Sequence, residues 1–164
     1  MDSHDVGGLW LLNEMWGFPA GVPEDERLDY LKTIMVCARG DGELSAGEKD
    51  WVIGYGAACG AHQKTVDALE AYEADDTLED ILNRNMPTAE TWGRVAIFDA
   101  VRAAAADHVY DDGEMEAVRF VAHRLGISGD VVPEIEALYQ EEQDLKARRI
   151  ALLFNVQHPY QERG

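Results

Sequence analysis

The chain has 164 residues, of which 32 are acidic and 14 basic, and its formal net charge is −18 at pH 7. This length allows one domain with a real core, and an apolar fraction of 46% with four Trp argues against a disordered acidic tail. The charge argues against nucleic acid and anionic membranes as partners, because both are bound through Lys and Arg. It favours cations, basic partner surfaces or simple solubility instead.

The beginning of the chain predicts a helical arm. Apolar residues at helical spacing over residues 6–17 predict a short helix, which the Pro- and Gly-containing segment 18–23 ends. We expect residues 1–22 to pack on the body as an arm that buries its Trp side chains, with partner binding by this arm as the alternative. The main domain is then expected over residues 23–156, followed by a C-terminal tail, 157–164.

The first half of the main domain predicts four helices. Pro23 suits the first turn of a helix that stops at Gly40. Ser45 and Glu48 have capping-box spacing and open the next helix, which extends to about Cys59. Two further helices are predicted at about 62–72 and 75–85.

The second half contains the longest apolar helix, predicted from about Thr88 to Val109. Because it is apolar on most sides, it is the candidate for the central, most buried helix. We then expect a helix closed by Gly126, another capped by Ser128, and a last one over about 141–155. No alternating strand pattern with hairpin signals occurs. The sequence therefore predicts an all-α fold, a compact bundle of about eight helices around a central apolar helix.

Two acidic segments show that the chain repeats itself. Asp41 and Asp107 each follow an apolar, helix-like run and lie seven residues before a glutamate, Glu48 and Glu114 respectively. The flanking residues keep the same register without a gap, in the pairs Ala38/Ala104, Val52/Val118, Gly60/Gly126 and Val66/Val132. Self-similarity at a fixed register predicts two copies of one structural unit. We expect two pseudo-symmetric helix-loop-helix units, each with an acidic loop.

Helix capping explains only part of these loops. Ser45 with Glu48, and Asp111 with Glu114, have capping-box spacing and need no ligand. Asp41 and Asp107 are different, because they follow helices whose C-terminal dipole disfavours an acidic side chain. If the two units pack about a pseudo-twofold axis, these carboxylates converge, and two carboxylates about 4 Å apart repel by roughly 4 kcal/mol at an effective dielectric of 20.

A divalent cation would relieve that repulsion, and protonation is the other route. Oxygen ligands alone suit Mg²⁺, Ca²⁺ or Mn²⁺, whereas participation of His108 would admit Zn²⁺ or Fe²⁺. An EF-hand is excluded, because Cys37 and Arg39 stand where its first two acidic ligands belong.

At these residues the chain resembles the TerB family of tellurite-resistance proteins. The resemblance is carried by residues 38–48 and by the later copy, 107–114, and it covers roughly residues 26–140. It implies an all-α fold with internal pseudo-symmetry, a clustered acidic site for divalent metal, and association with stress-response and metal-resistance systems. Carried over by position, that site comprises Asp41, Glu48, Asp107 and Glu114, with Asp111 and Asp112 as neighbours. The second copy departs from the family pattern at His108, where a Gly is expected.

The sequence carries no enzyme motif such as HExxH, a P-loop, GxGxxG or GxSxG. Cys37 and Cys59 are interpreted as buried, reduced thiols, and the first residues lack the basic region of a signal peptide. We therefore predict a non-enzymatic cytoplasmic domain that binds a divalent cation and acts as a sensor or adaptor in tellurite resistance or chemical stress. The alternatives are a metal-independent acidic module that docks a basic protein, and a metal-dependent enzyme or accessory subunit in small-molecule metabolism.

Overall fold

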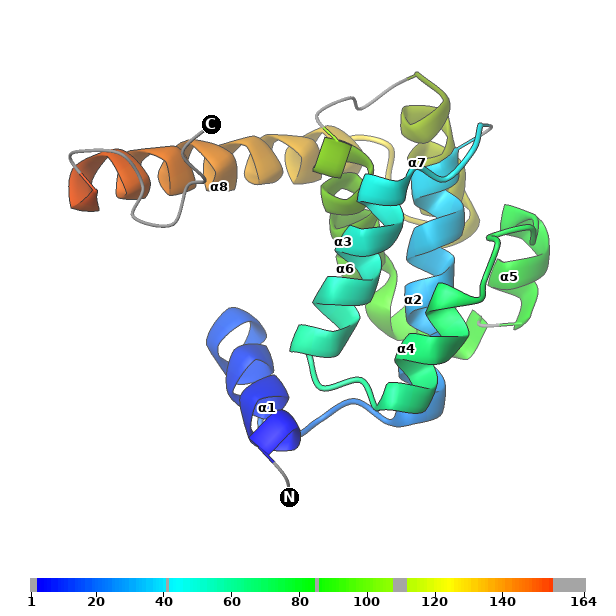
Figure 1. The fold of residues 1–164 in the computed structure, drawn as a ribbon. Helices are drawn as coiled ribbons and strands as arrows, with labels where there is room; N and C mark the ends of the chain where they lie inside the picture. The colour runs from blue at the N-terminus through cyan, green and yellow to red at the C-terminus, as the bar shows by residue number, and fades with distance from the viewer. Residues whose placement is uncertain (1–2, 41, 85, 108–111, 155–164) are drawn as a thin grey trace.

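The structure, a computed structural model, describes residues 3–40, 42–84, 86–107 and 112–154, without the side chains of residues 3, 86–91 and 107. All regular structure in these ranges is helical (Figure 1), as the sequence predicts. The elements are α1 (Ser3–Trp16), α2 (Glu24–Arg39), α3 (Ala46–Ala58), α4 (Gln63–Glu70), α5 (Leu78–Arg84), α6 (Met86–Ala104), the 3₁₀ turn η1 (Ala105–Asp107), α7 (Asp112–Arg124) and α8 (Val131–Leu153).

Helices α2 and α6 pack against each other at the centre of the bundle, and α3, α4, α5 and α7 surround them (Figure 1). On α6, Ala100, Ala103 and Ala104 are buried, and their small side chains allow the two helix backbones to approach closely. The apolar helix expected at the centre is α6, and α2 shares that position with it. Ile34 and Met35, adjacent on α2, are both fully buried, which means that α2 is covered on more than one side.

The repeat seen in the sequence is also a structural repeat. Helices α3 and α7 are each 13 residues long, and each has its repeat glutamate at the third position. Both are closed by a glycine in the left-handed region, Gly60 at φ 89° and Gly126 at φ 66°. The following N–H groups, of Ala61 and Ile127, reach back to carbonyls in the last turn, the Schellman arrangement, at 2.9 Å in both copies. Equivalent residues therefore close the second helix of each unit in the same way.

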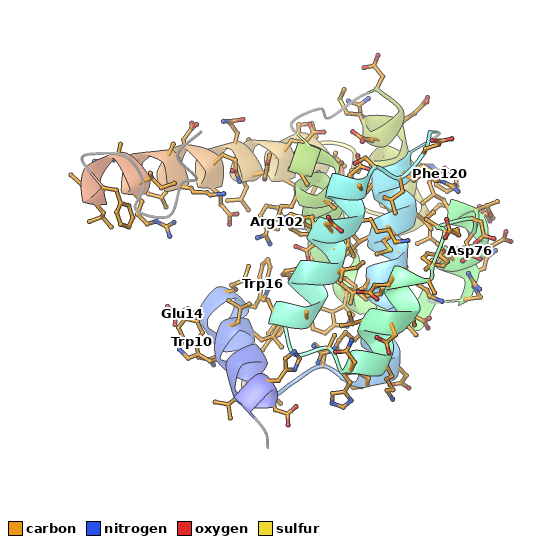
Figure 2. The ribbon with its side chains drawn as sticks, in the orientation of Figure 1. Trp10, Glu14, Trp16, Asp76, Arg102 and Phe120 are labelled. Carbon is orange, nitrogen blue, oxygen red and sulfur yellow. The ribbon has the colours of Figure 1, made fainter. Side chains whose placement is uncertain are left out.

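The N-terminal helix α1 packs on α3 through a glycine contact. A Cβ atom on Gly8 would lie 2.5 Å from the Cα of Gly60, so only glycine permits this approach. Trp16 packs edge-to-face on Phe98, with ring centroids 6.1 Å apart. Trp10, however, is 63% exposed and points away from the body (Figure 2), so the expectation that the arm buries its Trp side chains is wrong for this residue. Trp10 lies on the face of α1 opposite to the one that α3 covers.

Helix α8 is one uninterrupted helix, and this corrects the prediction of two helices with a break near residue 140. The residues around that point, Gln140 to Glu142, are good helix formers, so nothing local interrupts the helix. Ser128 does not cap it either. The N-cap residue is Asp130, and its own side chain makes no capping bond. Only the beginning of α8 packs on α6 and α7, and the remainder extends beyond the bundle (Figure 1).

In the described part of the chain, no helix is both long and apolar enough to cross a lipid bilayer.

Candidate metal centre at the paired acidic loops

The first acidic loop joins α2 to α3 through a tight turn. Gly40 ends α2 with φ 58° and donates its N–H to the Cys37 carbonyl at 3.1 Å. The predicted capping box then opens α3: the Glu48 N–H donates to Ser45 Oγ at 3.2 Å, and the Ser45 N–H donates to Glu48 Oε2 at 2.8 Å. The carboxylate of Glu48 is therefore held back toward the loop, and its residue is only 3% exposed.

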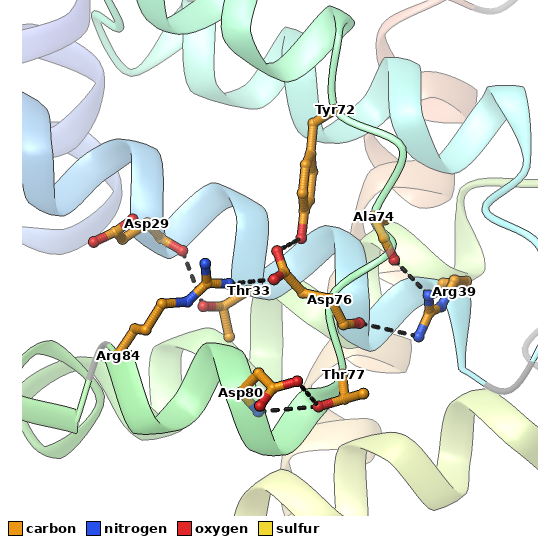
Figure 3. Close-up of polar contacts among 9 residues, drawn as sticks. All are labelled: Asp29, Thr33, Arg39, Tyr72, Ala74, Asp76, Thr77, Asp80 and Arg84. Atoms are coloured by element: carbon orange, nitrogen blue, oxygen red, sulfur yellow. Dashed lines mark hydrogen bonds and ion pairs between the residues drawn. The ribbon is translucent and has the colours of Figure 1, made fainter.

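Arg39 attaches this end of α2 to the segment between α4 and α5 (Figure 3). Its guanidinium donates to the backbone carbonyls of Ala74 and, at 3.3 Å, of Asp76. The Asp76 carboxylate in turn accepts from the Tyr72 hydroxyl and forms an ion pair with Arg84. The sequence did not point to this role of Arg39, because its acceptors are backbone atoms distant in the chain.

The second loop begins where α6 tightens. The predicted helix to Val109 is α-helical only to Ala104 and continues as the 3₁₀ turn η1 through Asp107. On the far side of the loop, Asp112 is exposed in the first turn of α7, and Glu114 is buried, at 5% exposure. Each unit thus buries a glutamate at the third position of the helix that follows its loop.

The segments that flank the two loops meet through their backbones, and the contact is crosswise between the repeats. A Cβ atom on Gly40 would lie 2.8 Å from both the backbone nitrogen of Glu114 and the carbonyl carbon of Gly113. In the other direction, the turn η1 of the second unit packs against α3 of the first. The end of the first helix of each unit therefore lies beside the second helix of the other unit. As a result, the backbone that flanks both acidic segments gathers at one end of the bundle.

The structure describes three side chains of the seven candidate ligands, namely those of Glu48, Asp112 and Glu114. Asp41, His108 and Asp111 lie outside the described residues, and Asp107 is described by its backbone alone. Among the described side chains, no three from His, Cys, Asp and Glu are close enough together to hold a metal ion. The described carboxylates offer oxygen donors only, which is the chemistry that Mg²⁺, Ca²⁺ and Mn²⁺ prefer.

A third buried acidic residue, Asp99, was not singled out from the sequence. Its carboxylate is fully buried in α6 and accepts from the Tyr30 hydroxyl at 2.7 Å and from Arg102 Nη1 at 3.2 Å. Burial raises the pKa of Asp99, although hydrogen bonds from Tyr30, Arg102 and Tyr55 oppose that shift. The sequence feature that could have identified Asp99 is the presence of an acidic residue within the longest apolar run. Asp99 is shielded from solvent, and its hydrogen bonds join α6 to Tyr30 of α2 and Tyr55 of α3.

Both cysteines are buried and are not joined to each other, as the sequence suggests. Burial raises the pKa of Cys37 to about 12, so this thiol stays protonated near neutral pH.

The helical bundle of two repeated units defines a class of all-helical domain that a solved structure also shows. A crystal structure of a tellurite resistance protein from Nostoc punctiforme matches this chain with a TM-score of 0.87 and 31% sequence identity. The match covers 98% of this chain and 100% of that protein's chain. The chain belongs to the TerB family of tellurite-resistance proteins. It matches no protein-family model and no curated protein sequence.

Proposed function

We propose that this protein is a non-enzymatic cytoplasmic domain that binds a divalent cation between its two acidic loops. In this proposal other components of a tellurite-resistance or chemical-stress response recognise the cation-bound form of the protein, which therefore acts as a sensor or adaptor. The neighbour from Nostoc punctiforme is described as a tellurite resistance protein, and that description supports the cellular context.

One observation carries the proposal: the contact of Gly40 with the backbone of Glu114. Asp41 follows Gly40 directly in the sequence, so it lies one residue along the chain from the contact with the second unit's helix. Asp107 likewise belongs to the turn that packs on α3. Carboxylates brought together from two loops repel each other, and a cation offsets that repulsion. Asp41, Asp107, Glu48 and Glu114 would be the principal ligands, with Asp111, Asp112 and His108 as neighbours.

The test is thermal unfolding of the purified protein with chelator and then with Mg²⁺, Ca²⁺, Mn²⁺ or Zn²⁺. Binding to the folded protein alone raises the melting temperature, by an amount that grows with the free ion concentration. We expect such a rise with at least one of the ions, and we expect it to disappear in the double variant Asp41→Asn/Asp107→Asn. Metal analysis of the protein as purified identifies the ion.

The matched control is the double variant Asp50→Asn/Glu116→Gln. These exposed residues lie two positions after Glu48 and Glu114, on the same two helices. Their replacement removes two negative charges, as many as the test variant removes. The control keeps the metal response if the loops bind the ion, and loses it if the ion responds only to overall negative charge. No response to any ion in the wild type refutes the proposal.

A metal-independent interaction module is the second candidate, and the capping box favours it. One oxygen of Glu48 already accepts the Ser45 N–H, so part of the geometry of the first loop is explained without an ion. In that case the acidic surface would dock a basic protein, and binding would weaken with rising salt. An unchanged melting temperature with every ion, together with salt-sensitive binding of a basic partner, would support this module.

A further inference from the structure

The projecting part of α8 carries a row of exposed leucines. Leu138, Leu145 and Leu152 are 49%, 58% and 75% exposed. They recur every seven residues, which is close to two helical turns, so they form one stripe along the helix. From Gln140 to Phe154, every residue except Gln143 is exposed, so this length of helix has little contact with the bundle.

This stripe is separate from the face that packs on the bundle. The packed residues are Val132, Ile135 and Tyr139, and at about 100° per residue they lie roughly 80–140° around the helix from the leucines. Helix α8 therefore has two apolar faces, of which the bundle covers one. An isolated helix of this length is marginal in water without packing, and exposed apolar rows of this kind mark interaction surfaces.

The charges beside the stripe are arranged symmetrically about Leu145. Glu141 and Glu142 lie four and three residues before it, and Arg148 and Arg149 lie three and four residues after it. By the helical period, Glu142 and Arg149 flank one side of the stripe, whereas Glu141 and Arg148 flank the other. The same segment is thus acidic on one side of its midpoint and basic on the other.

We propose that this face of α8 binds the α8 helix of a second copy of the chain in an antiparallel pair. With Leu145 beside its counterpart at the two-fold axis, Leu138 of each copy faces Leu152 of the other. Glu142 then lies opposite Arg149, and Glu141 opposite Arg148, so every flanking charge meets the opposite charge. A parallel pair would place Glu beside Glu and Arg beside Arg, which charge repulsion disfavours.

A groove at the base of α8 fits the same arrangement. Leu138 and Ile135 line it together with Trp16 of α1 and Phe98 of α6. In the antiparallel pair, the last turn of the other copy's α8 arrives beside Leu138. Leu153 of that turn, which is 66% exposed, lies on the side of the stripe that faces the groove. The pairing therefore covers apolar surface on the bundle as well as on the helix.

The test measures the mass of the full chain by sedimentation over a range of concentrations, with chelator present so that metal binding has no influence. We expect a concentration-dependent dimer. The substitution Leu145→Glu should raise its dissociation constant by more than about tenfold, because it places two charges at the axis. Phe120→Glu is the control, since this exposed residue lies on α7, away from α8 (Figure 2), and the dimer should persist in it.

Charge exchange tests whether these charges hold the pair together, and cysteine substitutions test its direction. The variants Glu141→Arg/Glu142→Arg and Arg148→Glu/Arg149→Glu should each be monomeric alone and form a one-to-one dimer when mixed. A disulfide should form between Leu138→Cys of one copy and Leu152→Cys of another, but not between two Leu138→Cys chains. A chain that stays monomeric at its highest soluble concentration, or a dimer that tolerates Leu145→Glu, overturns the proposal.

Discussion

Gly40 and Glu114 are neighbours in space although they belong to different repeats: a Cβ atom on Gly40 would lie 2.8 Å from the Glu114 backbone nitrogen. This distance is too short for any side chain, and the nitrogen is a backbone atom, which cannot move aside as a flexible side chain could. The contact therefore requires glycine at the end of α2. It also places the end of α2, just before the first acidic loop, beside the first turn of α7, which follows the second.

Replacement of Gly40 by alanine should strongly destabilise the protein. Its φ of 58° with ψ of −123° is a conformation that favours glycine, and the added methyl group would overlap the start of α7. We expect a loss of about 2–4 kcal/mol in the free energy of unfolding, measured by urea denaturation. Gly42→Ala is the control: its Cβ would lie 3.7 Å from the Arg39 carbonyl oxygen, so a change within about 0.5 kcal/mol is expected.

The capping box separates the structural role of Glu48 from its proposed ligand role. Ser45→Ala removes the side-chain acceptor of the Glu48 N–H and should cost about 1 kcal/mol with or without metal. Glu48→Gln keeps an oxygen that accepts the Ser45 N–H but removes the charge. We expect this variant to melt near the wild-type temperature in chelator and to lose much of the stabilisation by cation. Equal cation responses of Glu48→Gln and the wild type would exclude Glu48 as a ligand.

The buried carboxyl of Asp99 should make stability depend on pH. Its pKa is raised in the folded protein above the usual 3.8, so the folded chain binds this proton more tightly than the unfolded chain does. The resulting stabilisation is complete below about pH 3.8 and is lost as the pH rises through the raised pKa. Relative to Asp99→Asn, which does not titrate, the wild type should therefore gain stability as the pH falls from 7 toward 4.

Urea denaturation of both proteins at constant ionic strength measures this difference. Tyr30→Phe provides the control, because the Tyr30 hydroxyl bond lowers the pKa of Asp99 and its removal should move the gain to higher pH. A wild-type advantage that shrinks toward low pH would contradict the assignment.

The two arginines in Figure 3 should differ in importance. Arg39 donates to two backbone carbonyls in partly buried hydrogen bonds, so Arg39→Ala should cost about 1–2 kcal/mol. Arg84 is 58% exposed in its ion pair with Asp76, and exposed pairs contribute little, so Arg84→Ala should cost less than about 0.5 kcal/mol. Thermal unfolding of the two variants side by side measures the difference. Equal losses would mean that the exposed ion pair contributes as much as the backbone contacts, contrary to this expectation.

The local features of the fold could be predicted from the sequence. The capping box at Ser45 and the closing glycines, Gly60 and Gly126, depend on neighbours within a few residues, so their spacing alone indicates them. The repeat could be predicted for the same reason, since the two copies use the same local signals. Convergence of the two acidic loops, in contrast, could be expected from the sequence only on the assumption that the two units pack face to face.

Features that depend on distant residues could not be predicted. Arg39 finds its acceptors after α4, and Asp99 finds Tyr30 on a different helix. The exposure of Trp10 depends on which face of α1 meets α3, and the weak amphipathic pattern of that helix does not determine the face. The break predicted within α8 had no helix-ending residue near residue 140 to support it. The ligand positions themselves depend on the conformation of the loops. The sequence does not determine that conformation, because the acidic residues there are compatible with both helix capping and metal binding.

The crosswise contact of the two repeats means that neither can open alone. Fraying at the end of α2 would uncover the first turn of α7, and melting of the turn after α6 would uncover α3. Amide hydrogen exchange in these four places should therefore follow one shared opening reaction. A ligand or partner that holds one of these contacts closed would then slow exchange at the other, between segments separated in the sequence by about half of the domain.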